Sequence, residues 1–223
     1  MSNVSEFSFG RSLLMTAIDG EKTKFATRLL SSSQVDLSAK DKSGKTALHY
    51  AVEKGYSNLV KRILLTASGE GIGGDSERSG NDGGDKAGGG GKSAGRALWS
   101  KSAVSLVRCR DLDGVTAFHL ACSSGSNAAI AALLQVDAAE IGAPDAAGWS
   151  PLHRAAFGGF EEVVDLLLEC GVADDGVTKE GFTPFSLAKS EEMKRLFLQK
   201  VSMVVVVVTV VVVALIMTVG TLN

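Results

Sequence analysis

The chain has 223 residues, and its 23 lysines and arginines nearly balance its 25 aspartates and glutamates, which leaves a net charge of -2. Such a balance excludes a protein in which bulk positive charge drives binding to nucleic acid. Three cysteines without a Cys-x-x-Cys pair and three scattered histidines exclude a disulfide scaffold and a zinc finger, so we expect neither metal nor cofactor.

The N-terminal segment, residues 1–20, does not resemble an export signal. It contains Glu6, Arg11 and Asp19 and has no apolar run of the length that a secretory signal requires. We therefore expect the body of the protein to lie in the cytosol, with its thiols reduced.

Residues 14–30 form the first candidate unit. Their apolar residues, such as Leu14 and Leu30, have the spacing of residues 48–64, 34 positions later in the chain. The intervals of three and four residues are typical of helices. We therefore predict a divergent first copy of the structural unit that follows.

A six-residue motif recurs four times in the rest of the chain. It reads Gly-Lys-Thr-Ala-Leu-His at 44–49, Gly-Val-Thr-Ala-Phe-His at 114–119, Gly-Trp-Ser-Pro-Leu-His at 148–153 and Gly-Phe-Thr-Pro-Phe-Ser at 181–186. The first glycines are 70, 34 and 33 residues apart. This period indicates a repeat architecture.

The motif also predicts the structure of each unit. The Thr or Ser can cap a helix, and Pro151 and Pro184 occupy the first helical position, where a missing N–H is tolerated. Small residues follow, and then a second apolar stripe with helical spacing. Each unit is thus a helical hairpin that cannot bury its apolar face alone, so the units must stack.

Residues 68–104 form an insertion between the second and third units. Residues 69–95 contain twelve glycines in 27 positions and have almost no apolar side chains to bury, so we expect a flexible loop. Gly91-Lys92-Ser93 is similar to the end of a phosphate-binding loop, but Lys86 stands where that motif needs its first glycine. For residues 97–107 we leave open whether they dock on the stack or form a short helix.

After a shortened last unit, residues 201–219 carry no charge and include eleven valines. As a helix they would span about 28 Å, close to the roughly 30 Å core of a bilayer. They therefore predict a C-terminal transmembrane helix. A buried core strand is the alternative, but strands rarely exceed about ten residues.

The flanks of this segment predict its orientation. Lys194, Arg195 and Lys200 precede it, and uncharged residues follow it, so the body is expected on the cytosolic side of a single-pass tail anchor. A removable GPI signal is less consistent with the missing export signal. By resemblance to known tail anchors, the uncharged end favours the endoplasmic reticulum or another endomembrane over the mitochondrial outer membrane.

The period of 33 and the pattern Thr-Pro-Leu-His-x-Ala resemble the ankyrin repeat. The resemblance implies an all-α ankyrin-repeat solenoid of four to five helical hairpins, with repeats 1–2 in residues 11–67 and repeats 3–5 in residues 105–200. It also implies that His49, His119 and His153 are structural, each bonding back to the capping residue of its own repeat.

The resemblance further implies a concave protein-binding surface, formed by the turn tips and the first helix of each repeat. The side chains expected there are Lys45, Tyr50, Trp149, Arg154, Phe157 and Phe182. Tyr50, Trp149, Arg154 and Phe182 are of types that dominate interface energies, and Phe157 is their neighbour. The alternative for Trp149 and Phe182 is that they only cover adjacent turns.

Two functions remain, because no carboxylate pair, nucleophile motif or metal motif supports an enzyme or a small-molecule substrate. The first is an adaptor that holds a partner protein at the cytosolic face of a membrane. The second is a soluble regulator or inhibitor of another protein, whose valine-rich tail is an assembly or degradation signal. A subunit of a larger membrane complex would show the same features as the adaptor.

Overall fold

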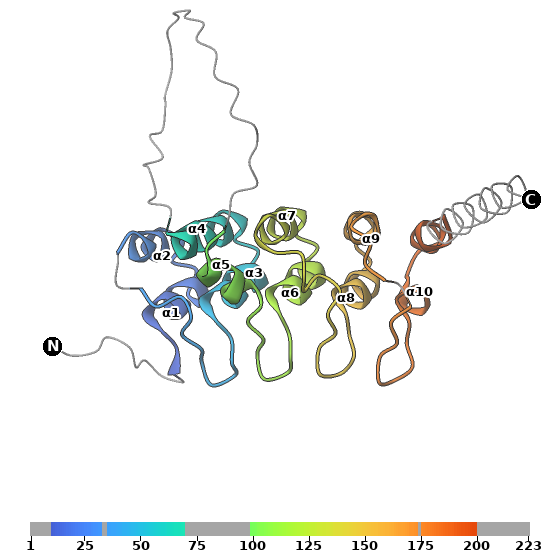
Figure 1. Cartoon of the computed structure of the whole chain (residues 1–223), viewed down its shortest axis with the longest axis horizontal. Coiled ribbons are helices and arrows are strands. Elements are labelled where there is room, and N and C mark those ends of the chain that lie inside the picture. Colours follow the sequence, from blue (N-terminus) through green and yellow to red (C-terminus); the bar gives the residue numbers. More distant parts are fainter. Residues whose placement is uncertain (1–9, 33–34, 70–98, 174, 200–223) are drawn as a thin grey trace, which may run out of the picture.

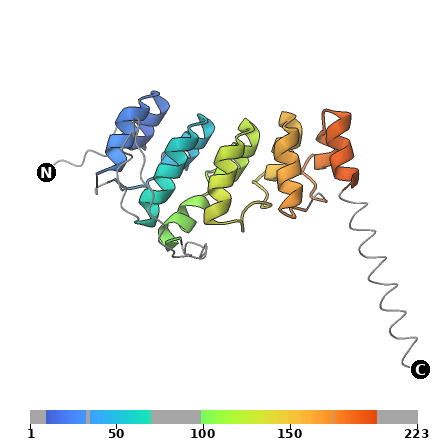
Figure 2. The same ribbon diagram turned by 90° about the horizontal axis from the view of Figure 1, so that it is seen from above.

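The computed structural model describes residues 10–32, 35–69, 99–173 and 175–199. Within these ranges the chain folds into α-helices that lie in two rows, with long turns projecting beyond the inner row (Figure 1). Seen from above, the outer helices lie side by side along one axis (Figure 2). The described residues thus form an elongated stack.

Five helical pairs make up this stack in the described residues. The inner row contains α1 (Leu13–Asp19), α3 (Ala47–Glu53), α6 (Ala117–Ser124), α8 (Pro151–Gly158) and α10 (Pro184–Leu187). The outer row contains α2 (Thr23–Leu30), α4 (Ser57–Ser68), α7 (Asn127–Val136), α9 (Glu161–Glu169) and helical residues 191–199. The all-α repeat solenoid is confirmed, including the divergent first unit.

The inner helices begin at the motif, as predicted. Ser150 is the N-cap of α8, where its side chain accepts a hydrogen bond from the backbone N–H of His153, and Pro151 occupies the first turn. The histidine ring accepts in return from the backbone N–H of Ser150 at 3.1 Å. Thr46 and Thr116 cap α3 and α6 with the same reciprocal pattern. Local hydrogen bonds therefore determine where each inner helix starts.

The turns between repeats stack on one another through their backbones. In the third repeat, Asp111 accepts from the N–H groups of Asp113 at 3.0 Å and Val115 at 2.8 Å, which closes the turn. The backbone N–H of Ala146, in the next turn, donates to the carbonyl of Asp113 at 2.9 Å. Gly114 has a φ of 75°, and a Cβ there would lie 2.9 Å from the Ala146 nitrogen. The motif therefore requires glycine for both conformation and space.

The three histidines join consecutive repeats. Each is fully buried, and each Nε2 bonds to a carbonyl of the next repeat. His49 meets Val115 at 3.3 Å and His119 meets Trp149 at 2.9 Å, while the third bond joins His153 to the next turn. The predicted structural role is confirmed, and it extends to the neighbouring repeat.

One helix lies outside the repeat pattern. This helix, α5 (Lys101–Val107), buries Ala103, Leu106 and Val107 and packs against α4 and α7. The question left open by the sequence is thus settled in favour of a short docked helix. Residues 101–104, assigned above to the flexible insertion, form the first turn of α5. Burial of Ala103, Leu106 and Val107 anchors this C-terminal end of the insertion to the stack. Residues 70–98 lie outside the described residues.

The last repeat is shortened, as predicted. Helix α10 ends after four residues, and Ser186 replaces the motif histidine. The Ser186 hydroxyl bonds only within the last repeat in the contacts described. It accepts from the backbone N–H of Thr183 at 2.9 Å and donates to the Thr183 carbonyl at 2.8 Å. The predicted membrane segment, residues 201–219, lies outside the described residues. Among the helices of residues 10–32, 35–69, 99–173 and 175–199, none has the length and apolarity needed to cross a bilayer.

Candidate functional site

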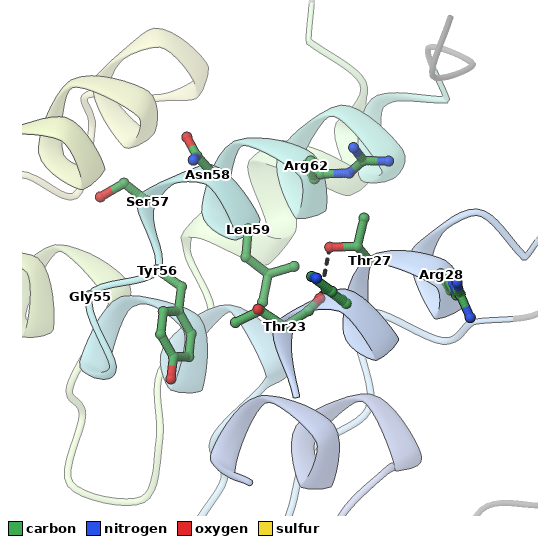
Figure 3. A pocket seen from close by; sticks show the side chains of 10 residues that line it. Thr23, Thr27, Arg28, Gly55, Tyr56, Ser57, Asn58, Leu59 and Arg62 are labelled. Atoms are coloured by element: carbon green, nitrogen blue, oxygen red, sulfur yellow. Dashed lines mark hydrogen bonds between the residues drawn. The ribbon is translucent and has the colours of Figure 1, made fainter. Parts of the chain in front are cut away.

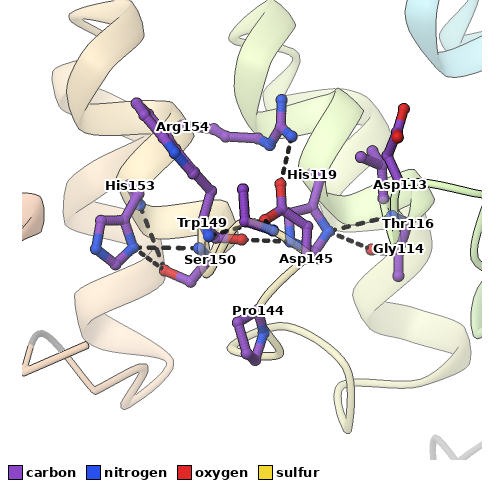
Figure 4. A network of polar contacts seen from close by, with 12 residues as sticks. Asp113, Gly114, Thr116, His119, Pro144, Asp145, Trp149, Ser150, His153 and Arg154 are labelled. Carbon is purple, nitrogen blue, oxygen red and sulfur yellow. Dashed lines mark hydrogen bonds and ion pairs between the residues drawn. The ribbon is translucent and has the colours of Figure 1, made fainter. Parts of the chain in front are cut away.

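The turn before α8 positions the first side chain of the candidate site. Asp145 accepts from the backbone N–H groups of Ala147 and Trp149, both at 2.9 Å, and closes the turn around Gly148. The carbonyl of Trp149 bonds to His119 of the preceding repeat (Figure 4). The backbone of Trp149 is therefore held from both sides, while its indole remains partly exposed.

A nearly buried ion pair supports this turn. Arg154, on α8, donates to Asp145 at 2.6 Å (Figure 4), and the Asp145 side chain is 3% exposed. Burial alone would raise the pKa of Asp145, but the hydrogen bonds from Arg154 and from the turn amides outweigh it and hold that pKa below its usual value. The carboxylate stays charged and pairs with Arg154.

Two aromatic rings and a lysine form the rest of the site. The rings of Trp149 and Phe157 meet edge to face with centroids 5.6 Å apart, a favourable geometry for aromatic pairs. Phe157 is 55% exposed, and the Lys189 ammonium lies 5.0 Å from the centre of its ring. We call Asp145, Trp149, Arg154, Phe157 and Lys189 the Trp149 site.

The Trp149 site lines a cavity of about 500 Å³ that also touches Ser123, Gly158 and Phe160. Exposed aromatic rings beside a lysine suit an apolar or aromatic side chain of a partner that also carries an acidic group. The cavity draws residues from the third, fourth and fifth repeats, so only the stacked protein forms it. Its carboxylate, Asp145, is already paired with Arg154.

The predicted interface residues fall into three places. Trp149, Arg154 and Phe157 come together in the cavity, as their common repeat suggests. Phe182 is 42% exposed in the next turn and does not line the cavity. Lys45 and Tyr50 belong to the second repeat and lie elsewhere along the same face.

Tyr50 is 5% exposed, so it presents little of its ring to a partner. The Arg11 guanidinium lies 5.1 Å from the ring centre, and the phenol donates to Asp41 at 2.7 Å. Burial, together with that hydrogen bond, raises the pKa of Tyr50 to about 12. Lys45 pairs with Glu53 at 2.9 Å at the surface. The Arg11 guanidinium pairs in turn with Asp19 at 2.7 Å.

The sequence analysis missed two members of the site, Asp145 and Lys189. A signal existed for Asp145, because an Asp stands four residues before the corresponding position in three turns, at 41, 111 and 145. No local signal could find Lys189. It lies 32 residues beyond Phe157 and reaches that ring because the last repeat stacks on α8.

A second cavity, of about 680 Å³, lies between α2 and α4 on the outer row (Figure 3). Its lining is mostly polar or cationic and includes Thr23, Thr27 and Arg28. The Thr27 hydroxyl already donates to the Thr23 carbonyl at 2.8 Å. This cavity lacks the exposed aromatic pair that makes the Trp149 site suited to a protein side chain.

Within the described part of the chain, no cluster of three or more His, Cys, Asp or Glu side chains could hold a metal ion. Burial lowers the pKa of all three histidines, which are committed to repeat joints. Burial raises the pKa of the Cys122 thiol, so it remains protonated and unreactive at neutral pH.

Comparison with known proteins agrees with this geometry. The family model for ankyrin repeats (3 copies) matches residues 2–72 and 97–180. The chain is also 34% identical over 93 residues to "SMC5-SMC6 complex localization factor protein 1" from Homo sapiens and to the Bos taurus protein of that name. The matched stretch covers 40% of this chain and 9% of each of these relatives.

Proposed function

The chain belongs to the ankyrin repeat family, a family of protein-interaction modules, and we propose that it is an adaptor that holds a partner protein at a membrane. The partner binds at the Trp149 site through an apolar or aromatic side chain flanked by an acidic residue. Residues 201–219 enter the membrane and keep the repeats on its cytosolic face.

The exposed aromatic pair is the observation that carries the binding proposal. A solvent-exposed Phe157 against Trp149, with Lys189 above it, leaves apolar surface uncovered beside a cation. Aromatic residues and arginine supply most of the energy at protein interfaces, especially at the centre of a contact. Phe182 and Lys45 belong to other turns of the stack and can extend the contact.

The curated relatives support a localising role. Their name describes a localization factor for the SMC5-SMC6 complex. The likeness is limited to 93 residues, so it supports the binding of a protein in order to place it, without naming the partner.

The membrane part of the proposal rests on residues 201–219. Nineteen residues without a charge match the thickness of a bilayer core as a helix, and Lys194, Arg195 and Lys200 on one side favour a cytosolic location for the repeats. We propose the endoplasmic reticulum or another endomembrane as its location.

Proximity labelling in cells from a ligase fused to the N-terminus tests both parts. Three chains are compared with the wild type: one with residues 201–219 deleted, one with Trp149→Ala and Phe157→Ala, and one with Leu112→Ala as a matched control. Leu112 is 77% exposed at the tip of another turn. Far-ultraviolet circular dichroism of the purified variants checks that each one folds.

We expect the deletion to disperse a membrane-specific set of labelled proteins, and the double variant to remove a small subset of that set. Leu112→Ala should leave the set intact. If deletion changes nothing while the double variant still loses a partner, the protein is the soluble regulator. If the double variant loses none, the Trp149 site is not the binding surface.

A further inference from the structure

The last turn of the stack has an open side. In each earlier turn the motif glycine faces the next turn: a Cβ on Gly148 would lie 3.1 Å from the backbone at Thr178 and Lys179. The same atom on Gly181 would meet nothing within 4 Å. Among the described residues, no further repeat covers this end of the stack.

The inner helix of the last repeat leaves a large aromatic ring on that open side. Phe185 has the motif position of Leu48, Phe118 and Leu152, each of which is 0% exposed beneath the following repeat. Phe185 is 40% exposed, although its ring packs edge to face on Phe197 with centroids 6.1 Å apart. The ring of Phe185, at a position that is buried in the other repeats, is therefore exposed at the end of the stack.

The outer helix of the last repeat, residues 191–199, differs from α9 on the side that faces the next repeat. Helix α9 and residues 191–199 both begin with two glutamates and bury their third and seventh residues. The fourth and eighth residues of α9, Val164 and Leu168, are 0% and 8% exposed. Their counterparts are Lys194, a cation, and Leu198, which is 58% exposed.

The lysine argues against a protein cover. Val60 and Ile130, which share this position in their repeats, are also 0% exposed, so a further repeat or a second copy stacked there would bury the ammonium of Lys194. Lys194 pairs with Glu191 at 2.7 Å, and taking this exposed ion pair out of water is costly unless the cover supplies matching polar groups. The cover must therefore take up Phe185 and Leu198 and still leave Lys194 among water or anions.

The apolar segment that follows would bring a bilayer close to this end of the stack. Leu198 precedes Val201, the first residue of the apolar segment, by three positions, which limits their separation to about 11 Å whatever the conformation. Lys194, Arg195 and Lys200 lie in the same stretch, just after Glu191 and Glu192, and Glu191 pairs with Lys194 at 2.7 Å. Apolar groups beside cations match the headgroup region of a bilayer that contains anionic lipid.

We propose that the open face of the last repeat, formed by Phe185, Lys194, Arg195 and Leu198, lies on an anionic bilayer surface. Phe185 and Leu198 insert at the level of the headgroups, while the two cations contact lipid phosphates or carboxylates. The stack then stands on the membrane by its C-terminal end, with the Trp149 site about one repeat above the lipid. This inference rests on the proposed insertion of residues 201–219.

Quenching by brominated lipids tests this contact. The full chain is reconstituted into vesicles of phosphatidylcholine and phosphatidylserine, with Trp99→Phe and Trp149→Phe as background and Phe185→Trp as the reporter. A matched reporter, Leu112→Trp, lies on an exposed turn of the third repeat. Co-flotation with vesicles is measured on the same samples.

We expect brominated lipid to lower the emission of the Phe185→Trp reporter by about twofold, because interfacial groups sit roughly 5–10 Å into the headgroup boundary. Emission of the Leu112→Trp reporter should not change. Adding Lys194→Gln and Arg195→Gln, or leaving out phosphatidylserine, should weaken the quenching without reducing flotation.

The outcomes separate the two proposals. If the chain floats with the vesicles but Phe185→Trp is not quenched, the face does not touch lipid and this inference is wrong, while membrane insertion stands. If copies also cross-link through that face, a second copy is the cover. If the chain does not float, insertion of residues 201–219 and the contact that depends on it both fail.

Discussion

The three buried histidines form bonds that require their neutral form. In the third repeat, the backbone N–H of Thr116 donates to Nδ1 of His119 at 3.2 Å, so Nε2 carries the hydrogen that reaches the carbonyl of Trp149 at 2.9 Å. A second proton, on Nδ1, would face a donor. Burial lowers the pKa of His119 to about 4.

This shift predicts a stability that depends on pH. The unfolded chain binds a proton at His119 near pH 6.5, whereas the folded chain binds it only near pH 4. Neutral His119 therefore adds its full contribution to the free energy of unfolding above pH 6.5. This contribution, on the order of 3 kcal/mol at most, is lost as the pH falls from 6.5 to 4. Urea unfolding of wild type and His119→Gln at several pH values should show a shallower dependence in the variant. Equal slopes would contradict this account.

Two glycines with left-handed backbone, Gly114 of the motif and Gly55 after α3, differ in what they contact. Gly114 and Gly55 have φ values of 75° and 74°, but a Cβ would approach the next turn only at Gly114. We expect Gly55→Ala to lower the free energy of unfolding by about 1–2 kcal/mol, the cost of left-handed backbone, and Gly114→Ala to lower it by more. Chemical denaturation measures both. A similar loss in the two variants would show that turn stacking does not constrain this position.

At the scale of elements, α5 packs on the stack at the C-terminal end of the insertion. It packs against α4 and α7, and Ser100 caps it while donating to the carbonyl of Ala67 at 2.7 Å. That bond joins the start of α5 to the last turn of α4 and closes the base of the glycine-rich segment. A helix of seven residues is too short to be stable alone, so its packing maintains it.

Truncating its buried side chain should therefore destabilise the protein. Leu106 is 3% exposed, and Leu106→Ala is expected to cost about 2–5 kcal/mol through lost burial and the cavity left behind. Ser105→Ala, at an exposed position of the same helix, should change the free energy by less than about 0.5 kcal/mol. Thermal unfolding of the two variants gives the comparison. A stable Leu106→Ala protein would mean that α5 contributes little to the fold.

At the scale of the whole molecule, each repeat contacts only its neighbours, so stability is distributed along the axis. The third repeat lies between the second and the fourth, with α6 packed on both α3 and α8. The last repeat has one neighbour in the described structure. A core substitution in the third repeat should therefore also destabilise the second and fourth repeats. A core substitution in the last repeat should affect mainly that repeat.

Two core variants test this expectation. Phe118 and Phe197 are 0% and 1% exposed, and replacing either by Ala should cost about 3–5 kcal/mol in local stability. Hydrogen exchange of the full chain should show Phe197→Ala loosening residues 184–199 alone. Phe118→Ala should loosen α3 and α8 as well as α6. Uniform loosening in both variants would show that the stack unfolds as one cooperative unit.

The motif letters were sufficient to predict the repeats and the helix starts, because caps and turns are interactions between residues a few positions apart. The role of the histidines came from the resemblance to ankyrin repeats. The membership of the Trp149 site could not be predicted from the sequence alone. Lys189 reaches Phe157 across a repeat boundary, and Arg11 covers Tyr50 from another repeat, so the order of packing decides which ring is exposed. The docked α5 likewise depends on a surface that only stacked helices provide. Local chemistry determined the units, and burial between units determined the surface that a partner meets.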